Sequence, residues 1–254
     1  IIDHSTTTQQ AASHTGGRYG KGGDLLYRWG NPQTYGRGTA ADKKLFGQHY
    51  PHRVKPGLKD AGAVLVFNNG AGRPGSSYSS VELIALPMDP NGNFTQPATG
   101  TFLPDSAYWK YTAPIPTDFF ATNISGAQRL ENGNMLICSG PNGKFFEIDS
   151  LKNTVWKYVS PTGQGGTLLA QGSNPTANPV FRCTEYTASY PGFNGRTLSP
   201  GSPIELNPLA YSCNMALGIN QPQQPERDGL RLLNYGNGRF GLLSSGAPAF
   251  INIE

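Results

Sequence analysis

The same succession of short strand-like segments occurs twice in the chain, and this repeat limits its folds more than any other feature. Each copy contains a buried apolar run, then an alternating run, then a stretch in which Trp precedes Lys and Tyr. The first copy reads GAVLVFNNG (62–70), SSVELIALPMD (79–89) and AYWKY (107–111), and the second reads NGNMLICSG (132–140), GKFFEIDS (143–150) and NTVWKYVSP (153–161). A repeated unit of about 40 to 50 residues with several short strands is typical of the blades of a β-propeller.

The start of the chain matches the end of this unit. IIDHS (1–5) is similar to the EIDS of the second copy, and DLLYRWGNP (24–32) is similar to the Trp-containing segments. In this alignment Trp29, Trp109 and Trp156 occupy one position of the repeat. We predict that each of these Trp side chains packs between neighbouring blades.

The composition supports an all-β fold. The chain has 33 Gly and 21 Pro, about one residue in five, and both residue types are unfavourable inside helices. PVFRCTEY (179–186) reads as the remnant of a further blade, which still leaves fewer than the about four blades that a closed propeller needs. We therefore predict that residues 1–206 form the C-terminal part of a propeller, beginning in mid-blade, and that the missing blades precede Ile1.

Charge and hydropathy disfavour two kinds of partner. The formal net charge is +4 and the Lys and Arg residues form no run of like charge, so nucleic-acid binding is not expected. No segment resembles the about 20 apolar residues of a transmembrane helix. The sequence is compatible with a homo-oligomer but does not indicate one.

The three cysteines form no CxxC pair, which disfavours a zinc cluster, and we expect neither a metal nor a cofactor. Cys138 stands in the apolar run NMLICSG, which predicts a buried thiol. Cys183 and Cys213 stand in less regular segments. We predict that these two form a disulfide if the compartment is oxidising.

The segment FGQHYPHRV contains two of the four histidines. Pro51 disfavours a helix here, and in a strand the side chains alternate between the two faces. His49 and Arg53 are then expected on one face and His52 on the other, which also disfavours a shared zinc ion. Arg53 is a candidate substrate-binding residue in this interpretation.

The repeat gives His49 a position in the blade. Alignment of QHYPHRV with SGAQRL (125–130) places Ser125 or Gly126 in the position of His49. The first strands of propeller blades line the central channel, so we predict that His49 faces this channel. Asn123 and Ser125 are further candidates for substrate contacts there.

Several longer motifs resemble the bacterial arylsulfotransferase (aryl-sulfate sulfotransferase) family, most closely its secreted, propeller-type members. They are GGDLLYRWGNPQTYGRGTAADKKLFGQH, VLVFNNGAGRPGSSYSSVELI, NISGAQRLENGNMLICSGPNGKFFEID and YPGFNGRTLSPGSPIEL. The similarity covers about residues 1–206 and corresponds to the C-terminal half of such proteins. It implies a six-bladed propeller, of which this chain holds a part.

The resemblance also implies a reaction. The family moves a sulfuryl group from an aryl sulfate to a phenol through a transiently sulfated histidine, without a nucleotide donor, and the FGQH motif assigns that histidine to His49. Other histidines and an arginine of the site are then expected in the N-terminal half, so this chain alone should be inactive. Two alternatives stay open: a hydrolase with water as acceptor, and a non-catalytic extracellular or cell-surface propeller that serves binding or structure.

The end of the chain differs from the repeat. Residues 207–229 read as a linker that ends in QPQQPERDG, and residues 230–254 read as a short β tail. LRLLNYGNGRFGLLSSGAPAFINIE resembles the beginning of a type IX secretion sorting domain, although Tyr235 stands where Pro is usual; the alternative is a simple β-hairpin. The sorting-domain interpretation implies a secreted, periplasmic or cell-surface protein of a Gram-negative bacterium.

Overall fold

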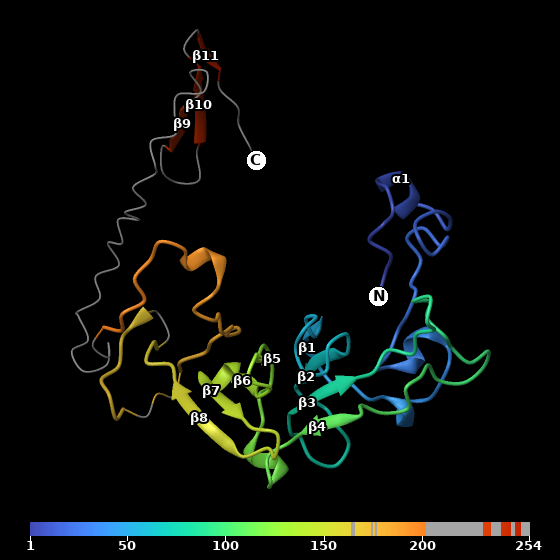
Figure 1. Cartoon of the computed structure of the whole chain (residues 1–254), viewed down its shortest axis with the longest axis horizontal. Coiled ribbons are helices and arrows are strands. Elements are labelled where there is room, and N and C mark those ends of the chain that lie inside the picture. The colour runs from blue at the N-terminus through green and yellow to red at the C-terminus, as the bar shows by residue number, and fades with distance from the viewer. Residues whose placement is uncertain are drawn as a thin grey trace. The chain divides into compact units, whose positions relative to one another are not determined.

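The computed structural model describes residues 1–201, except 164, 165, 174 and 176, and the backbone of three strands between 231 and 249. The described chain is mostly β (Figure 1) and its contacts divide it into two units, residues 1–209 and 210–254. The first unit contains two four-stranded antiparallel sheets. The predicted all-β class is therefore confirmed.

Each sheet is a simple up-and-down succession of four strands in chain order. The first consists of β1 (His49–Arg53), β2 (Val64–Asn68), β3 (Ser80–Ile84) and β4 (Trp109–Tyr111). The second consists of β5 (Gly126–Arg129), β6 (Met135–Ser139), β7 (Lys144–Ile148) and β8 (Thr154–Val159). The two copies of the sequence repeat thus form equivalent strands, and the QHYPHRV and SGAQRL segments contain the first strand of each sheet, as predicted.

The helices among the described residues of the first unit are short. They are α1 (Thr8–Ala11) and the 3₁₀ helices η1 (Pro32–Tyr35), η2 (Ala40–Asp42), η3 (Pro116–Asp118), η4 (Gly140–Asn142) and η6 (Pro191–Phe193). A capping box explains where α1 begins. The Thr7 hydroxyl accepts from the Gln10 backbone N–H at 3.2 Å, and the Gln10 side chain accepts from the Thr7 N–H at 2.9 Å.

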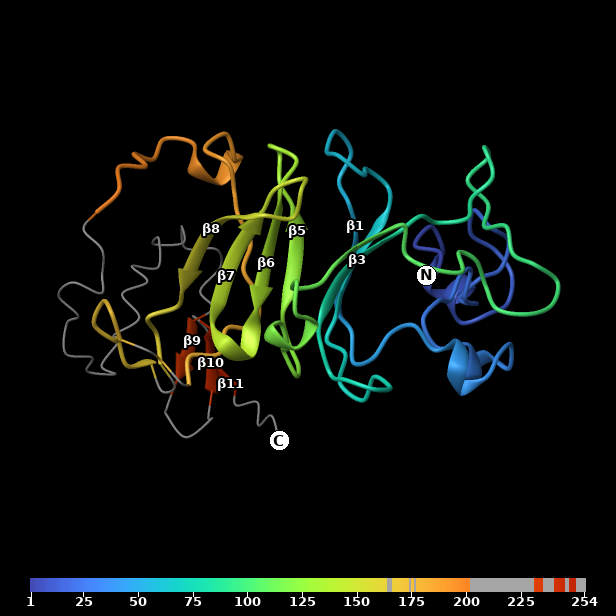
Figure 2. The ribbon, with the colours of Figure 1, turned by 90° about the horizontal axis from the view of Figure 1, so that it is seen from below.

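The two sheets share one hydrophobic core, and the first strand of the second sheet lies beside the first sheet (Figure 2). The connection between the sheets also contributes to this core. The buried side chains of the core are those of Val54, Ala63, Leu65, Phe67, Val81, Leu83, Tyr111, Phe119, Ala121, Ala127, Met135, Ile137 and Ile148. Each Leu or Phe buried here stabilises the fold by about 1.5–3 kcal/mol, so the two sheets depend on each other for stability.

Residues before β1 pack on the opposite face of the first sheet. Leu45 forms a smaller cluster with Val66 and Ile84, against which Trp29 also packs. The Trp29 indole N–H donates to the Pro104 carbonyl at 2.7 Å. This segment thus covers apolar surface that would otherwise face water.

The three Trp residues have different surroundings, which corrects the prediction of one shared role. Trp109 in β4 packs against the core between the sheets, as predicted. Trp29 lies outside any strand, and only an isolated bridge between Ile2 and Leu25 pairs the segments at the start of the chain. Trp156 in β8 is 46% exposed. β8 is the last of the described strands of its sheet.

A bulge in β1 changes which side chains share a face. His49 lies opposite Phe67, but His52 lies opposite Leu65, so β1 contains one residue more than β2 over this stretch. Tyr50 within the bulge has a φ of 53°. Because Phe67 and Leu65 share a face of β2, the bulge places His49 and His52 on one side and Arg53, opposite Val64, on the other. The predicted alternation, which grouped His49 with Arg53, is therefore wrong.

The second unit contains β9 (Arg231–Asn234), β10 (Phe240–Ser244) and β11 (Ala247–Ala249). They form an antiparallel sheet with the order β11-β10-β9. The predicted β tail at 230–254 thus contains three paired strands. The predicted linker at 207–229 lies outside the described residues.

Candidate functional site

His49 is the first residue of β1, and its ring orientation is fixed by two hydrogen-bond acceptors. Its Nδ1 lies 2.7 Å from Asn69 Oδ1 and 3.1 Å from the Gly47 carbonyl oxygen. The Asn69 amide nitrogen is occupied elsewhere, because it donates to the carbonyls of Ala121 at 2.8 Å and Ile124 at 3.1 Å. Asn69 therefore presents its oxygen to the ring, and Nδ1 must carry the hydrogen. In the neutral ring Nε2 then has a free lone pair.

Asn69 connects the end of β2 with the turn that leads into the second sheet. Its side chain is fully buried, and its carbonyl accepts from the Ser79 hydroxyl at 2.8 Å. Gly70 follows with a φ of 81°, and a Cβ there would collide with the Tyr78 carbonyl oxygen. The NNG sequence thus ends β2 in a turn that only Gly permits, and this turn holds Asn69 in place.

The predicted residues Asn123 and Ser125 lie in the turn that Asn69 contacts through Ile124. The buried Ser125 hydroxyl donates to the Asn123 carbonyl at 3.1 Å and accepts from the Gly140 N–H at 2.9 Å. It is therefore committed to the geometry of the turn. The Asn123 side chain is exposed and accepts from the Thr122 hydroxyl at 3.2 Å. The substrate contacts at Asn123 and Ser125 stay predictions.

Arg53 lies at the other end of β1 from His49. Its exposed guanidinium contacts the Met88 sulfur at 3.1 Å. With the bulge, it is also on the opposite face of the strand. The structure therefore does not bring Arg53 and His49 together, and a substrate contact by Arg53 stays a prediction.

A different arginine approaches β1. The Arg182 guanidinium lies 4.0 Å from the centre of the Tyr50 ring, and the Tyr50 and His52 rings are 4.3 Å apart. Burial lowers the pKa of His52, and the positive charges of Arg182 and Lys55 lower it further, against a raising effect of the hydrogen bond to the Tyr50 carbonyl. His52 is therefore neutral near pH 7. Arg182 supplies a positive charge beside Tyr50, which follows His49 in the chain.

Sequence reasoning did not identify Asn69, Tyr50 or Arg182. A signal existed for Asn69, since the NNG motif ends the strand that pairs with β1. A weaker signal existed for Arg182, since it belongs to the predicted blade remnant at 179–186. Nothing in the sequence indicates the bulge at Tyr50.

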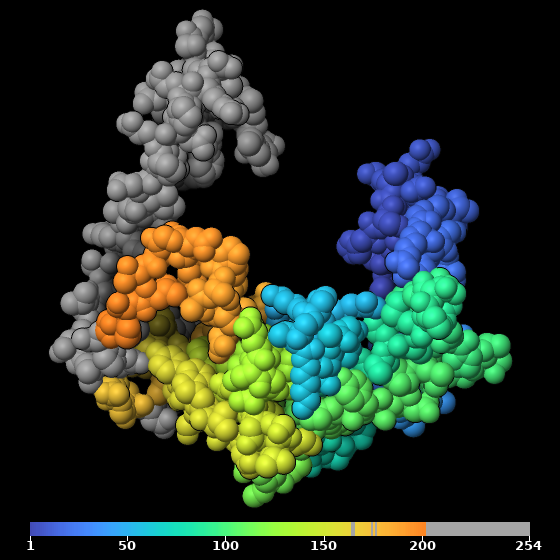
Figure 3. All heavy atoms as spheres, viewed as in Figure 1, coloured from blue at the N-terminus to red at the C-terminus, as the bar shows by residue number. Residues whose placement is uncertain are grey.

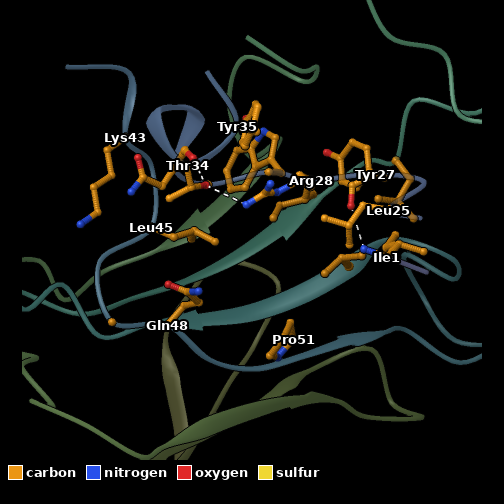
Figure 4. Close-up of a pocket in the computed structure, with 17 residues that line it drawn as sticks. Ile1, Leu25, Tyr27, Arg28, Thr34, Tyr35, Lys43, Leu45, Gln48 and Pro51 are labelled. Carbon is orange, nitrogen blue, oxygen red and sulfur yellow. Dashed lines mark hydrogen bonds between the residues drawn. The ribbon is translucent and has the colours of Figure 1, made fainter. Parts of the chain in front are cut away.

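Two cavities lie on either side of this region. One, of about 350 Å³, is bordered by β1, β5 and residues 184–191, and its lining includes Tyr50, His52 and Arg129. The other, of about 530 Å³, lies on the face of the first sheet that residues 1–45 cover (Figure 4). Aromatic and cationic side chains, among them Tyr27, Arg28, Tyr35 and Lys43, line the larger cavity. No histidine is among the described residues that line it, whereas His52 of β1 lines the smaller cavity, so we place the candidate site at β1.

The described residues contain no group of three or more His, Cys, Asp and Glu side chains arranged to hold a metal ion. In the same part of the chain, no helix has the length and apolar character required to cross a bilayer. Cys138 is buried and Cys183 half-buried, and both are free thiols. Cys213 lies outside the described residues, so its predicted pairing with Cys183 stays a prediction.

Neither a family model nor a curated protein nor a solved structure matches the chain.

Proposed function

We propose that the two sheets are neighbouring blades of a six-bladed β-propeller and that His49 is the nucleophile of an aryl-sulfate sulfotransferase. The two four-stranded sheets with a shared core support the propeller. The resemblance of the FGQH motif to the arylsulfotransferase family supports the reaction. A secreted or cell-surface location, from the resemblance of residues 230–254 to a sorting domain, belongs to the same proposal.

The single observation that carries the proposed reaction is the pair of acceptors at His49 Nδ1. They leave the Nε2 lone pair free to attack sulfur. In the first step a bond forms between Nε2 and sulfur, and the bond from sulfur to the aryl oxygen breaks, so that a phenolate leaves. In the second step an acceptor phenol gives its proton to the phenolate of the first step, its oxygen attacks the same sulfur, and the bond between sulfur and Nε2 breaks, which releases His49.

Asn69 has a definite role in this reaction. When Nε2 attacks sulfur, the imidazole ring gains positive charge. The hydrogen bond from Nδ1 to Asn69 Oδ1, 2.7 Å long before reaction, then becomes charge-assisted and strengthens. Because the Asn69 amide is already oriented by two carbonyls, it needs no reorganisation during the step.

Arg182 is a candidate cation for the sulfuryl oxygens. These oxygens carry negative charge throughout the transfer, and a fixed cation near them lowers the barrier. Arg182 is held over the ring of Tyr50, and Tyr50 is the residue that follows His49 in the chain. The resemblance places the other histidines and an arginine of the site in the N-terminal half.

The test uses the full-length protein with an aryl sulfate and no acceptor, followed by trypsin digestion. The peptide 45–53 contains both His49 and His52, and fragmentation of this peptide identifies which ring carries the sulfuryl group. We expect the label on His49, its absence in His49→Ala, and its retention in His52→Gln. A label on His52, or unchanged turnover with a phenol acceptor in His49→Ala, would contradict the proposal.

The non-catalytic alternative predicts a different result in the same experiment. A propeller that only binds ligands would acquire no label on any histidine and would show no turnover. Hydrolysis instead of transfer would give the same label on His49, but the rate would not depend on the phenol concentration.

A further inference from the structure

Residues 178–185 lie against the second sheet without forming a further strand of it. The Val180 N–H donates to the Gly140 carbonyl at 2.9 Å, and the Ser125 N–H donates to the Phe181 carbonyl at 3.0 Å. The Gln128 side chain pairs with the Glu185 backbone in both directions, at 2.9 and 2.8 Å. Figure 3 shows this segment in orange against the yellow-green atoms of the sheet.

These contacts place Cys183 beside Cys138. Cys138 lies in β6 and is 1% exposed, whereas Cys183 is half-buried. Cys138 is the strand partner of Gly126, and the side chain of Arg182, the residue before Cys183, packs against Gly126. The Cys138 sulfur also lies 3.9 Å from the Val180 carbonyl oxygen. Residues of the 178–185 segment other than Cys183 thus also contact this thiol.

The two thiols are chemically unequal. Interaction with the Cys183 sulfur, together with burial, raises the pKa of Cys138, and the same interaction lowers the pKa of Cys183. Cys183 is also the more accessible of the two. It is therefore the thiol that reacts first with an incoming disulfide, since the thiolate is the attacking form.

We propose that Cys138 and Cys183 form a redox-active pair that closes to a disulfide when a small-molecule disulfide is the oxidant. The Cys183 thiolate attacks one sulfur of the oxidant, the oxidant's S–S bond breaks, and one thiolate leaves. Cys138 then loses its proton and attacks the Cys183 sulfur, which releases the second thiolate. The two cysteines give up two electrons and two protons, and the oxidant is reduced to two thiols.

The disulfide would fasten Arg182 to the second sheet, because Arg182 is the neighbour of Cys183. Without the bond, hydrogen bonds and the contact of Arg182 with the Tyr50 ring hold this segment. The value of this restraint for sulfuryl transfer rests on the proposed function, but the disulfide itself does not. A failure of the sulfotransferase assay would leave the thiol chemistry to be judged by its own test.

Trypsin separates the three cysteines, because each lies on its own peptide: 130–144 with Cys138, 183–196 with Cys183, and 197–227 with Cys213. The folded protein is treated with glutathione disulfide, its remaining thiols are alkylated, and it is digested without reductant. We expect cross-linked peptides 130–144 and 183–196. This product should persist in Cys213→Ser and disappear in Cys183→Ser.

Other products would overturn the proposal. Peptides 183–196 and 197–227 joined as the main product would show that Cys183 pairs with Cys213 instead. A stable glutathione adduct on Cys183 beside an alkylated Cys138 would show that the two thiols do not react with each other. Cys183→Ser changes a half-buried side chain, so its circular dichroism and unfolding midpoint can establish that the variant is folded.

Discussion

Replacement of Asn69 by Ala tests whether this residue selects the tautomer of His49. The Asn69 side chain makes three hydrogen bonds: it accepts from His49 Nδ1 and donates to the carbonyls of Ala121 and Ile124. Ala at this position removes all three. The effects on His49 and on stability can be measured separately, and neither requires enzymatic activity.

The magnitudes follow from the contacts. A net hydrogen bond is worth about 1 kcal/mol, and a buried group left without a partner costs about 1–3 kcal/mol. Ser79 retains a weak contact of 3.4 Å to the Ala121 carbonyl, which reduces the loss there. We therefore expect Asn69→Ala to lower the free energy of unfolding by about 2–4 kcal/mol. Loss of the Asn69 acceptor should reduce the preference of His49 for the Nδ1–H tautomer by about fivefold.

The ¹⁵N chemical shifts of the histidine rings report the tautomer directly, and His49→Gln assigns the His49 signals among the four histidines. Asn68→Ala is the matched control. Asn68 is equally buried and bonds to the Phe46 N–H, the Lys44 carbonyl and Glu82, but to no histidine. It should lose similar stability and leave His49 unchanged. An Nε2–H tautomer in the unaltered protein, or identical His49 shifts in Asn69→Ala, would refute the reasoning.

Three other predictions concern stability, each measured by denaturant unfolding. Asp60→Ala leaves the buried Arg129 without its carboxylate partner and should cost about 3–5 kcal/mol, part of which Arg129→Met restores; a loss below about 1 kcal/mol would indicate a surface pair. The pKa of His52 is lowered in the folded chain, so below about pH 6.5 the unfolded chain binds more protons at His52 than the folded chain does. The free energy of unfolding should therefore fall as the pH drops below about 6.5, and it should fall less in His52→Gln. Gly70→Ala should cost more than Gly72→Ala, because both have positive φ but only Gly70 lacks space for a Cβ; equal losses would exclude the clash.

The strands were predictable because the same succession of strand-like segments occurs twice in the sequence. Apolar runs at 62–70 and 132–140 became β2 and β6, which are inner strands of their sheets and almost wholly buried. A strand buried on both faces is mostly apolar, and this pattern can be recognised without knowledge of the strands beside it. Trp29 shows the limit of the same reasoning, since its segment resembles β4 but forms no strand. Similar residues do not make a strand where no neighbouring strand offers backbone partners.

The site was predictable only in part. His49 was identified by its motif and by its place in a first strand, and that place is confirmed. The alternation argument failed because it assumed a regular strand, whereas a single bulge at Tyr50 reverses the faces of all later residues. Asn69 and Arg182 are 20 or more positions from His49 in the chain. The contacts of Asn69 with His49 and of Arg182 with Tyr50 depend on the conformation of the loops between them, which no local sequence pattern predicts.

The geometry of His49 depends on the second sheet as much as on the first. The ring is oriented by Asn69, and Asn69 is oriented by the carbonyls of Ala121 and Ile124, which belong to the connection into β5. Ala121 in turn is buried in the core that both sheets share. A change in the packing of the two sheets must therefore move the carbonyls that hold Asn69, and with them the acceptor that selects the His49 tautomer. The first sheet carries His49, but the contact between the sheets holds the acceptor that selects its tautomer.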